Sequence, residues 1–283
     1  MHIDPVRLFK ADTPNTIVIL DAEVQYDHDV HRRYQASERW SPEDARGLDR
    51  REARGDPRIT PRWACQRIVA LSWLVMSQGD DGLRPVRMHT CGAPEQDEAG
   101  IVRTFFADME RLTAVQLVTW NGFGSDLPHL LLAAAATGLR LPTCLAKLHA
   151  PWPRGSGAHI DLMAEMCGGA DRVHLAEIAA KLDIPVKLTC RPDLVSKLME
   201  QGKWSSVKAV VEGDVLTTAM VLMRWRHLSG GSVSILEMTQ RLASFVAGHC
   251  GHRAYATDWI RFGERMLHDV MVSETAKLNA LAM

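Results

Sequence analysis

The stretch TIVILDAE, Thr16 to Glu23, is a run of apolar and β-branched residues that ends on two carboxylates. Such a continuous apolar run predicts a central strand that is covered on both faces of its sheet. Side chains two apart in a strand point to the same side, so Asp21 and Glu23 are expected to project together. Carboxylates this close repel unless a cation or a shared proton compensates them, and paired oxygen ligands favour Mg²⁺ or Mn²⁺. Many strands simply end on acids at the surface, so the rest of the chain has to decide.

The composition is that of an ordinary globular protein, with 283 residues, 46% hydrophobic and 24% charged. The longest apolar stretch, near residues 130–136, is too short to cross a bilayer, and the N-terminus lacks the pattern of an export signal. Six scattered cysteines form no C-x-x-C pair, so neither a zinc site nor a disulfide framework is indicated. We therefore expect a cytoplasmic protein with no membrane partner. The formal net charge of -1 means that a polyanion would be bound by a local patch and by metal.

Hydrophobic periodicity predicts an α/β architecture. Strands are expected at residues 16–23, 66–76, 83–89 and 115–120, the first three as an antiparallel meander, with a helix at 95–112. From residue 115 on, strand is followed by helix, which fits a mixed sheet with helices packed against it. Further helices are expected at residues 161–166, 174–182, 192–201 and 204–228 and in two segments after residue 230. The sheet is thus expected to occupy the first half of the chain only.

Residues 27–62 are a charged insertion, dense in Arg, Asp and Glu and broken by prolines and glycines. Interspersed charges of both signs predict a solvated loop or short helix, and a solubilising role is the favoured interpretation. A sharper hypothesis rests on the affinity of guanidinium groups for phosphate. Under that hypothesis the side chains that reach over a substrate backbone are Arg50, Arg51, Arg54 and Arg58.

The glycine pair at positions 230 and 231 is the best candidate for a domain boundary. It would separate a main domain, residues 1–229, from a C-terminal helical extension, residues 230–283. Apolar residues recur in this extension at helical spacing, which predicts packing against the core or against a partner subunit.

A third acid follows the fourth predicted strand, in the stretch TWNGFGSDLP at residues 119–128. Gly122 and Gly124 permit tight backbone turns, and Ser125 is a candidate helix cap. Asp126 falls in or near the first turn of the next helix, where it either helps start that helix or points back to the sheet edge.

A fourth acid, Asp214, opens the apolar helix in VEGDVLTTAMVLMRW, residues 211–225. An acid beside an apolar face is either a satisfied structural residue or a ligand kept charged by a cation. Composition alone does not choose between the two.

In this order the three stretches resemble the DEDD superfamily of 3′-to-5′ exonucleases. The likeness is closest to predicted bacterial exonucleases related to the proofreading exonuclease domain of B-family DNA polymerases. The matching residues are Asp21-Ala22-Glu23, Trp120-Asn121-Gly122 with Asp126-Leu127-Pro128, and Glu212-Gly213-Asp214-Val215 with Thr218. The likeness covers most of the chain from residue 16 to 226, and four acids in three ordered motifs are more specific than any one motif.

The resemblance implies a ribonuclease H-like mixed sheet flanked by helices, with a helical C-terminal part. It implies that two Mg²⁺ or Mn²⁺ ions and the catalytic function rest on Asp21, Glu23, Asp126 and Asp214. The residues implied to contact the terminal nucleotide are Trp120, Asn121 and Phe123. The expected activity is two-metal-ion phosphodiester hydrolysis that releases nucleoside monophosphates from the 3′ end of single-stranded nucleic acid. DNA is favoured over RNA, although no short motif here reports on the sugar.

One position departs from the superfamily pattern. Members usually carry Tyr or His four residues before the last Asp, where it orients or deprotonates the attacking water, and here that position is Val210. Valine makes no hydrogen bond, and loss of a general base typically costs on the order of 10² to 10⁴ in rate. The candidate replacements, none of them singled out, are Tyr26, His28, His159, His174, Ser205, Ser206 and Lys208.

Val210 therefore leaves other functions open. The main alternative is a catalytically weak or silent relative that binds nucleic acid or a protein through the same cleft. A third is an interaction protein that uses its C-terminal helices, and a homodimer through these helices is a further expectation.

Overall fold

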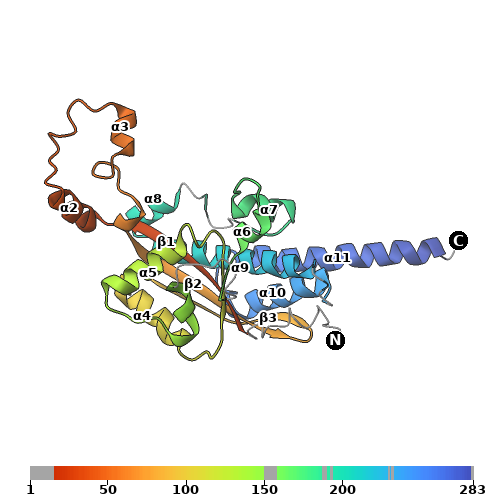
Figure 1. The fold of residues 1–283 in the computed structure, drawn as a ribbon. Helices are drawn as coiled ribbons and strands as arrows, with labels where there is room; N and C mark the ends of the chain where they lie inside the picture. The colour runs from red at the N-terminus through yellow and green to blue at the C-terminus, as the bar shows by residue number, and fades with distance from the viewer. Residues whose placement is uncertain are drawn as a thin grey trace, which may run out of the picture.

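The protein is built on one five-stranded sheet with the strand order β3-β2-β1-β4-β5 (Figure 1). The computed structural model describes residues 16–149, 158–186, 190–191, 194–228, 230 and 233–281. The strands are β1 (Thr16–Tyr26), β2 (Gln66–Gly79), β3 (Gly82–Gly92), β4 (Gln116–Thr119) and β5 (His159–Asp161). β1 to β3 form the predicted antiparallel meander, and β4 and β5 run parallel to β1. The predicted α/β class with a mixed sheet is confirmed.

β5 corrects the expectation that the sheet ends in the first half of the chain. It pairs with β4 through three residue pairs, the last of them Thr119 with Asp161. Three residues are too few to show a period of two, so nothing in the sequence distinguishes this strand from the start of a helix.

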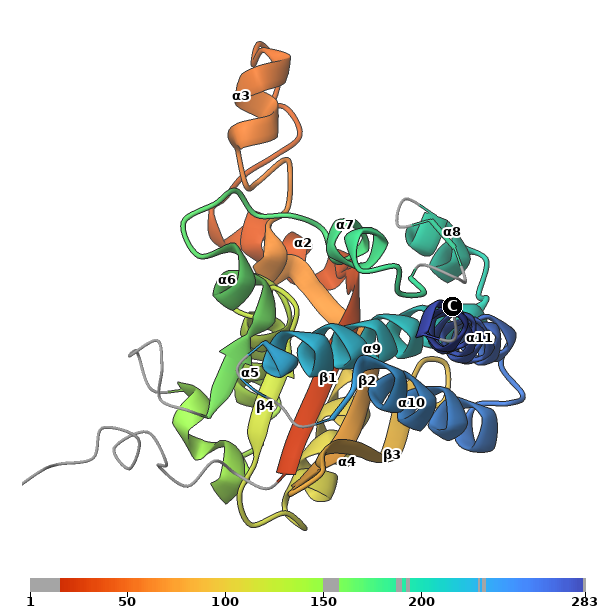
Figure 2. The same cartoon turned by 90° about the vertical axis from the view of Figure 1, so that its right-hand side faces the viewer.

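Helices cover both faces of the sheet (Figure 2). One face packs against α9 (Trp204–His227) and α10 (Ile235–His249), and the other packs against α4 (Glu98–Met109) and α5 (Asp126–Ala136). The smaller elements are η1 (Trp63–Cys65), η2 (Thr143–His149), α6 (Leu162–Cys167), α7 (Leu175–Lys181) and α8 (Val195–Glu200). In the part of the chain that the structure describes, no helix is both long and apolar enough to cross a bilayer.

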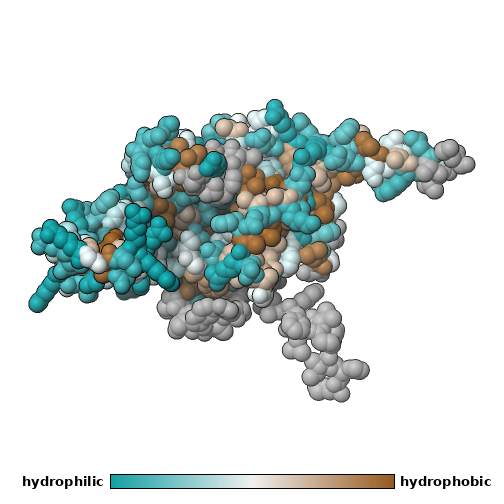
Figure 3. All heavy atoms as spheres, turned by 90° about the horizontal axis from the view of Figure 1, so that it is seen from above, coloured by the Kyte–Doolittle hydropathy of each residue, from teal (hydrophilic) through white to brown (hydrophobic). Residues whose placement is uncertain are grey.

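The charged insertion is an arm that rises beyond the end of the sheet (Figure 2) and carries mainly hydrophilic side chains (Figure 3). It holds two short helices, α2 (His28–Ser37) and α3 (Arg50–Gly55), each opened by an aspartate whose side chain accepts backbone N–H bonds. Arg58 pairs with Asp56 at 2.6 Å, so one of the four predicted backbone-binding arginines is held within the arm. The role of the other three, which are exposed, stays a prediction.

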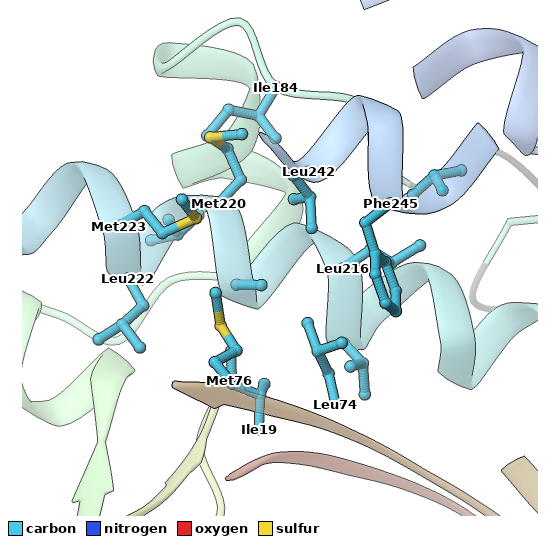
Figure 4. Packing of buried hydrophobic residues seen from close by; sticks show 14 of the residues in the cluster. Ile19, Leu74, Met76, Ile184, Leu216, Met220, Leu222, Met223, Leu242 and Phe245 are labelled. Atoms are coloured by element: carbon cyan, nitrogen blue, oxygen red, sulfur yellow. The ribbon is translucent and has the colours of Figure 1, made fainter. Parts of the chain in front are cut away.

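The opening apolar run is buried on both sides, which explains why it is continuous rather than alternating. Ile17 and Ile19 face the α9 side, whereas Val18 and Leu20 face the α4 and α5 side. Figure 4 shows the first of these layers, with side chains of α9 such as Leu216 lying over Ile19 and the strand beside it. The apolar residues of β1 that precede its first acid are therefore buried on both faces of the sheet.

The C-terminal helices share the core of the main domain. Buried residues of α10 and α11 (Ala256–Leu281) belong to the same apolar cluster as Ile17 and Leu74 of the sheet. Gly230 has a left-handed backbone, φ +94°, after the end of α9, while Gly231 lies outside the described residues. The outer end of α11 projects past the body (Figure 1) and exposes apolar side chains such as Met271. The homodimer through these helices stays a prediction.

Candidate active site

The first two acids emerge where β1 loses its parallel neighbour. β4 pairs with β1 only as far as Val118, which lies opposite Ile19, and the chain then leaves the sheet. Asp21 and Glu23 continue on the α9 side of the sheet and line a cavity of about 740 Å³. A register shift between Glu23 and Val24 bends the strand pair at this point. The strand therefore delivers both carboxylates to one cavity, as the alternation of side chains predicts.

The turn between β4 and α5 needs its particular residues. Asn121 adopts a left-handed backbone with φ +61°, which asparagine tolerates better than most residues. A Cβ atom on Gly122 would lie 1.9 Å from Thr119 Oγ1, so this position accepts no side chain. Ser125 is the residue before α5 as expected, but its side chain makes no capping bond, and its carbonyl instead accepts from His129.

A buried aspartate of the next strand holds this turn in place. Asp161 accepts hydrogen bonds from the backbone N–H groups of Asn121 and Phe123, at 3.1 Å each. The same carboxylate accepts a bond from Ala164 and so caps α6. The sequence analysis placed Asp161 only at the start of an expected helix; its position before an apolar helix could have indicated the cap, but not the bond to a residue 40 positions away.

Asp126 is the most deeply placed of the four acids. Its Oδ1 accepts a 3.2 Å hydrogen bond from the backbone N–H of Ala22, between the two acids of β1. Burial, together with the nearby carboxylates of Glu23 and Asp161, raises the pKa of the Asp126 carboxyl to about 7, although the backbone hydrogen bond from Ala22 acts in the opposite direction. The first two motifs, more than 100 residues apart, thus meet in one acidic site.

The third motif divides into one residue that faces the cavity and one that does not. Asp214 is buried and lines the cavity from α9. Glu212 instead contacts the C-terminal part of the chain. Its carboxylate accepts hydrogen bonds from Arg253 at 2.5 Å and from the Tyr255 hydroxyl at 2.9 Å. Thr217 is tied to the carbonyl of Pro185 at 2.8 Å.

The donor chemistry of the cavity suits a hard divalent cation. Besides Glu177 of α7, four carboxylates from three segments line it, and burial already disfavours the charge of one of these four. Within the described residues, however, no three Asp, Glu, His or Cys side chains are close enough together to form a finished metal site. The residues fit as oxygen ligands, and binding an ion would require them to approach one another.

Of the three predicted nucleotide contacts, two line the cavity, whereas Phe123 is not among its lining residues. Trp120 and Asn121 line it directly. Phe123 is 43% exposed and rests edge-on against His159, with ring centroids 4.6 Å apart. His159 Nε2 and Thr119 Oγ1 are hydrogen-bonded at 2.8 Å, and burial lowers the pKa of His159 to about 4.

Two lining residues escaped the sequence analysis. Arg172 and Glu177 belong to the loop and helix that roof the cavity, and Arg172 Nη1 lies 3.5 Å from Asn121 Oδ1. Both side chains are exposed and belong to no apolar pattern, so only the fold shows that they face the acids.

Val210 is packed in an apolar cluster and does not line the cavity. It is 3% exposed and belongs to an apolar cluster that includes Val195 and Met199 of α8. Most of the candidate replacements have partners elsewhere: Lys208 pairs with Glu95, for example, and Ser205 is the acceptor for Arg253. Of the seven candidates, His174 is the one whose residue lines the cavity.

Comparisons with known proteins point to one family. A family described as "Predicted 3'-5' exonuclease related to the exonuclease domain of PolB" matches residues 61–260. This range includes Asp126 and Asp214, whereas Asp21, Glu23 and most of the charged arm precede it.

Among solved structures, the chain is similar to the family B DNA polymerase of Pyrobaculum calidifontis, at 16% identity and a TM-score of 0.44. The match covers 83% of this chain, which spans 29% of the length of the polymerase. No curated protein matches the chain.

Proposed function

Because the chain belongs to the family of predicted 3′-5′ exonucleases related to the exonuclease domain of PolB, we propose that it is a metal-dependent 3′-5′ exonuclease. Its substrate would be the 3′ end of a single strand, and its products nucleoside monophosphates. Water would add its oxygen to the terminal phosphorus as the bond to the neighbouring 3′ oxygen breaks, and that oxygen would leave with a proton. DNA is favoured because the family is related to the exonuclease domain of PolB.

The observation that carries this proposal is the convergence of three distant segments. β1, the turn before α5, and α9 bring Asp21, Glu23, Asp126 and Asp214 to one cavity, and Trp120 and Asn121 share its wall. An aspartate whose pKa is raised by burial and then by a neighbouring glutamate is costly for a folded protein unless the site has a use for its negative charge.

The four acids would bind the metal cations, and an arginine at the cavity would bind the substrate. Asp21, Glu23, Asp126 and Asp214 would bind two Mg²⁺ or Mn²⁺ ions, which supply charge neutralisation and activation of water. Arg172, close to Asn121, would bind the terminal phosphate. His174 would orient the attacking water in place of the missing tyrosine or histidine, because it is the one candidate replacement that lines the cavity.

One observation favours a second function, a silent relative that binds nucleic acid without cutting it. The position that usually carries the water-orienting group is filled by Val210, under α8. Such a protein would keep the cavity and the strand-binding residues but would lack hydrolysis.

The two functions are separated by digestion of matched 5′-labelled DNA and RNA strands with Mn²⁺ or Mg²⁺. We expect stepwise shortening from the 3′ end, abolished in Asp21→Ala and Asp214→Ala. Asp269→Asn, an exposed change on α11, serves as the control and should cut as the wild type does.

Mn²⁺ binding, measured by calorimetry on the same proteins, gives a readout that does not depend on cutting. Shortening that persists in both alanine variants would refute the assignment of the acids. Metal-dependent strand binding without shortening would support the silent relative.

A further inference from the structure

A second aromatic surface lies beside the proposed site. Trp63, in η1, is 48% exposed, and among the other tryptophan and phenylalanine residues in the described part of the chain only Phe123, at 43%, is also exposed. Its indole stands edge-on to the ring of His129, with centroids 5.7 Å apart and planes at 81°. The indole is therefore a large apolar ring that packs against a buried histidine and is about half exposed to solvent.

The support is rigid and connects directly to the cavity. His129 is buried, and its two ring nitrogens are hydrogen-bonded to the Ser125 carbonyl at 2.7 Å and to Gln66 Oε1 at 3.0 Å. Ser125 lines the cavity and precedes Asp126, the first residue of α5. A ring held by such a chain of contacts loses little freedom when a ligand stacks on it.

The surroundings of Trp63 suit an anionic chain. Arg62 and Arg67 flank it in sequence and are exposed, and Arg67 is steadied by a 3.3 Å bond to Gln25. The sheet places the neighbouring strand end near the acids: Gln66, three residues after Trp63, lies opposite Tyr26, which is three residues beyond Glu23, or roughly 10 Å along the strand. A strand whose 3′ end entered the cavity would pass this surface with nucleotides further from that end.

We propose that Trp63 is a base-stacking platform for unpaired nucleotides upstream of the 3′ end, with Arg62 and Arg67 on their phosphates. The inference rests on the proposed function for the position of the 3′ end. Stacking on one aromatic face accepts any base, so the platform would bind single strands without reading their sequence. A duplex, whose bases already stack on one another, would gain nothing from it.

The test is binding of 5′-fluorescein oligothymidylates of about 3 and about 12 nucleotides to the full chain, in Ca²⁺ so that strands stay intact. Trp63→Ala should weaken binding of the longer strand by about 5- to 100-fold and leave the shorter one nearly unchanged. Trp63→Phe should retain most of the affinity, because it keeps a ring. Leu132→Ala, an exposed apolar residue further along α5, should bind as the wild type does.

Three results would overturn the platform. Trp63→Ala could bind the long strand as well as the wild type does, which would leave the indole without a role. It could lose affinity for both lengths equally, which would mean that Trp63 acts only by supporting α5. It could lose affinity equally for a blunt duplex, which would exclude stacking on unpaired bases.

This outcome is independent of catalysis. Cleavage is measured separately with Mn²⁺. If the wild type cleaves but Trp63→Ala leaves strand binding unchanged, only the platform is refuted. Strand binding that depends on Trp63 in a chain that never cuts would defeat only the exonuclease.

Discussion

Asp161 Oδ1 lies 3.1 Å from the backbone nitrogen of Asn121, and the other oxygen of the same carboxylate lies 3.1 Å from the nitrogen of Phe123. One buried side chain therefore fixes the turn that carries the proposed nucleotide contacts. Asp161→Asn would replace one acceptor oxygen by an NH₂ group that faces a backbone N–H. We expect a loss of about 1–3 kcal/mol in the free energy of unfolding, measured by urea denaturation, and weaker oligonucleotide binding.

The control for this change is Asp171→Asn, an equally isosteric substitution at an exposed position ten residues on. It should leave both measurements unchanged. If Asp161→Asn unfolds with wild-type stability, the two long-range bonds do not hold the turn.

His159 predicts a specific dependence of stability on acid. Burial keeps its folded pKa near 4, below the value of about 6.5 for an unfolded histidine. Between these values the unfolded chain binds the extra proton and the folded chain does not, so stability is full above pH 6.5 and falls as the pH drops toward 4. The contribution of this residue is up to about 1.4 kcal/mol per pH unit.

His159→Gln removes this titration. Urea denaturation at pH 7, 6 and 5 should show a shallower loss of stability in the variant than in the wild type. Identical slopes would assign the acid sensitivity to other groups.

The pair Glu212–Arg253 joins the helix of the third motif to the C-terminal helices. Glu212 is only 3% exposed, so removing its cation leaves a carboxylate buried without its charged partner. Arg253→Met should therefore lower the free energy of unfolding by about 3 kcal/mol or more, measured by denaturant titration.

Two comparisons test the cause of that loss. Adding Glu212→Gln to Arg253→Met should recover part of the stability, because the neutral amide costs less to bury. Arg265→Met, which breaks the exposed pair with Asp183, should cost less than about 1 kcal/mol. Similar losses in Arg253→Met and Arg265→Met would show that burial of Glu212 is unimportant.

Val210 can be tested by adding back the missing hydroxyl. The residue lies four positions before Asp214, on the same face of α9, in a filled apolar cluster. Val210→Tyr and Val210→Phe should both be destabilised by about 1–3 kcal/mol through overpacking. Only the tyrosine variant should cut faster than the wild type, in a single-turnover assay at a temperature where both variants are folded.

The phenylalanine variant is the matched control, because it shares the steric change without the hydroxyl. Equal rates for the two variants would show that a hydroxyl at this position does not reach the attacking water. His174 would then be the residue to change next.

Much of this fold was predictable because its signals are local. The apolar run that ends on Asp21 and Glu23 predicts a buried strand with two carboxylates on one side, since side chains alternate every residue. Helical spacing predicted α9, and the positions of Asp126 after a predicted strand and of Asp214 before an apolar run indicated the order of the motifs. The resemblance then connected these segments, which no single periodicity could do.

The remaining features depend on contacts that no local pattern records. β5 is too short to show the alternation of side chains that marks a strand. Arg172 and Trp63 are exposed residues, and their neighbours are determined by the folding of distant segments. Two acids of α9 have different surroundings: Asp214 lines the cavity, whereas Glu212 pairs with Arg253. This difference follows from which elements pack on each side of α9.

By itself, the sequence determined the buried strand, the four acids and their order, because hydrophobic periodicity and motif spacing are written along the chain. Only the tertiary structure decided which of these groups meet, that Asp161 holds the turn, and that Val210 is covered by α8. The reason is physical: burial and hydrogen bonding depend on three-dimensional neighbours, and those are set by the packing of helices on the sheet.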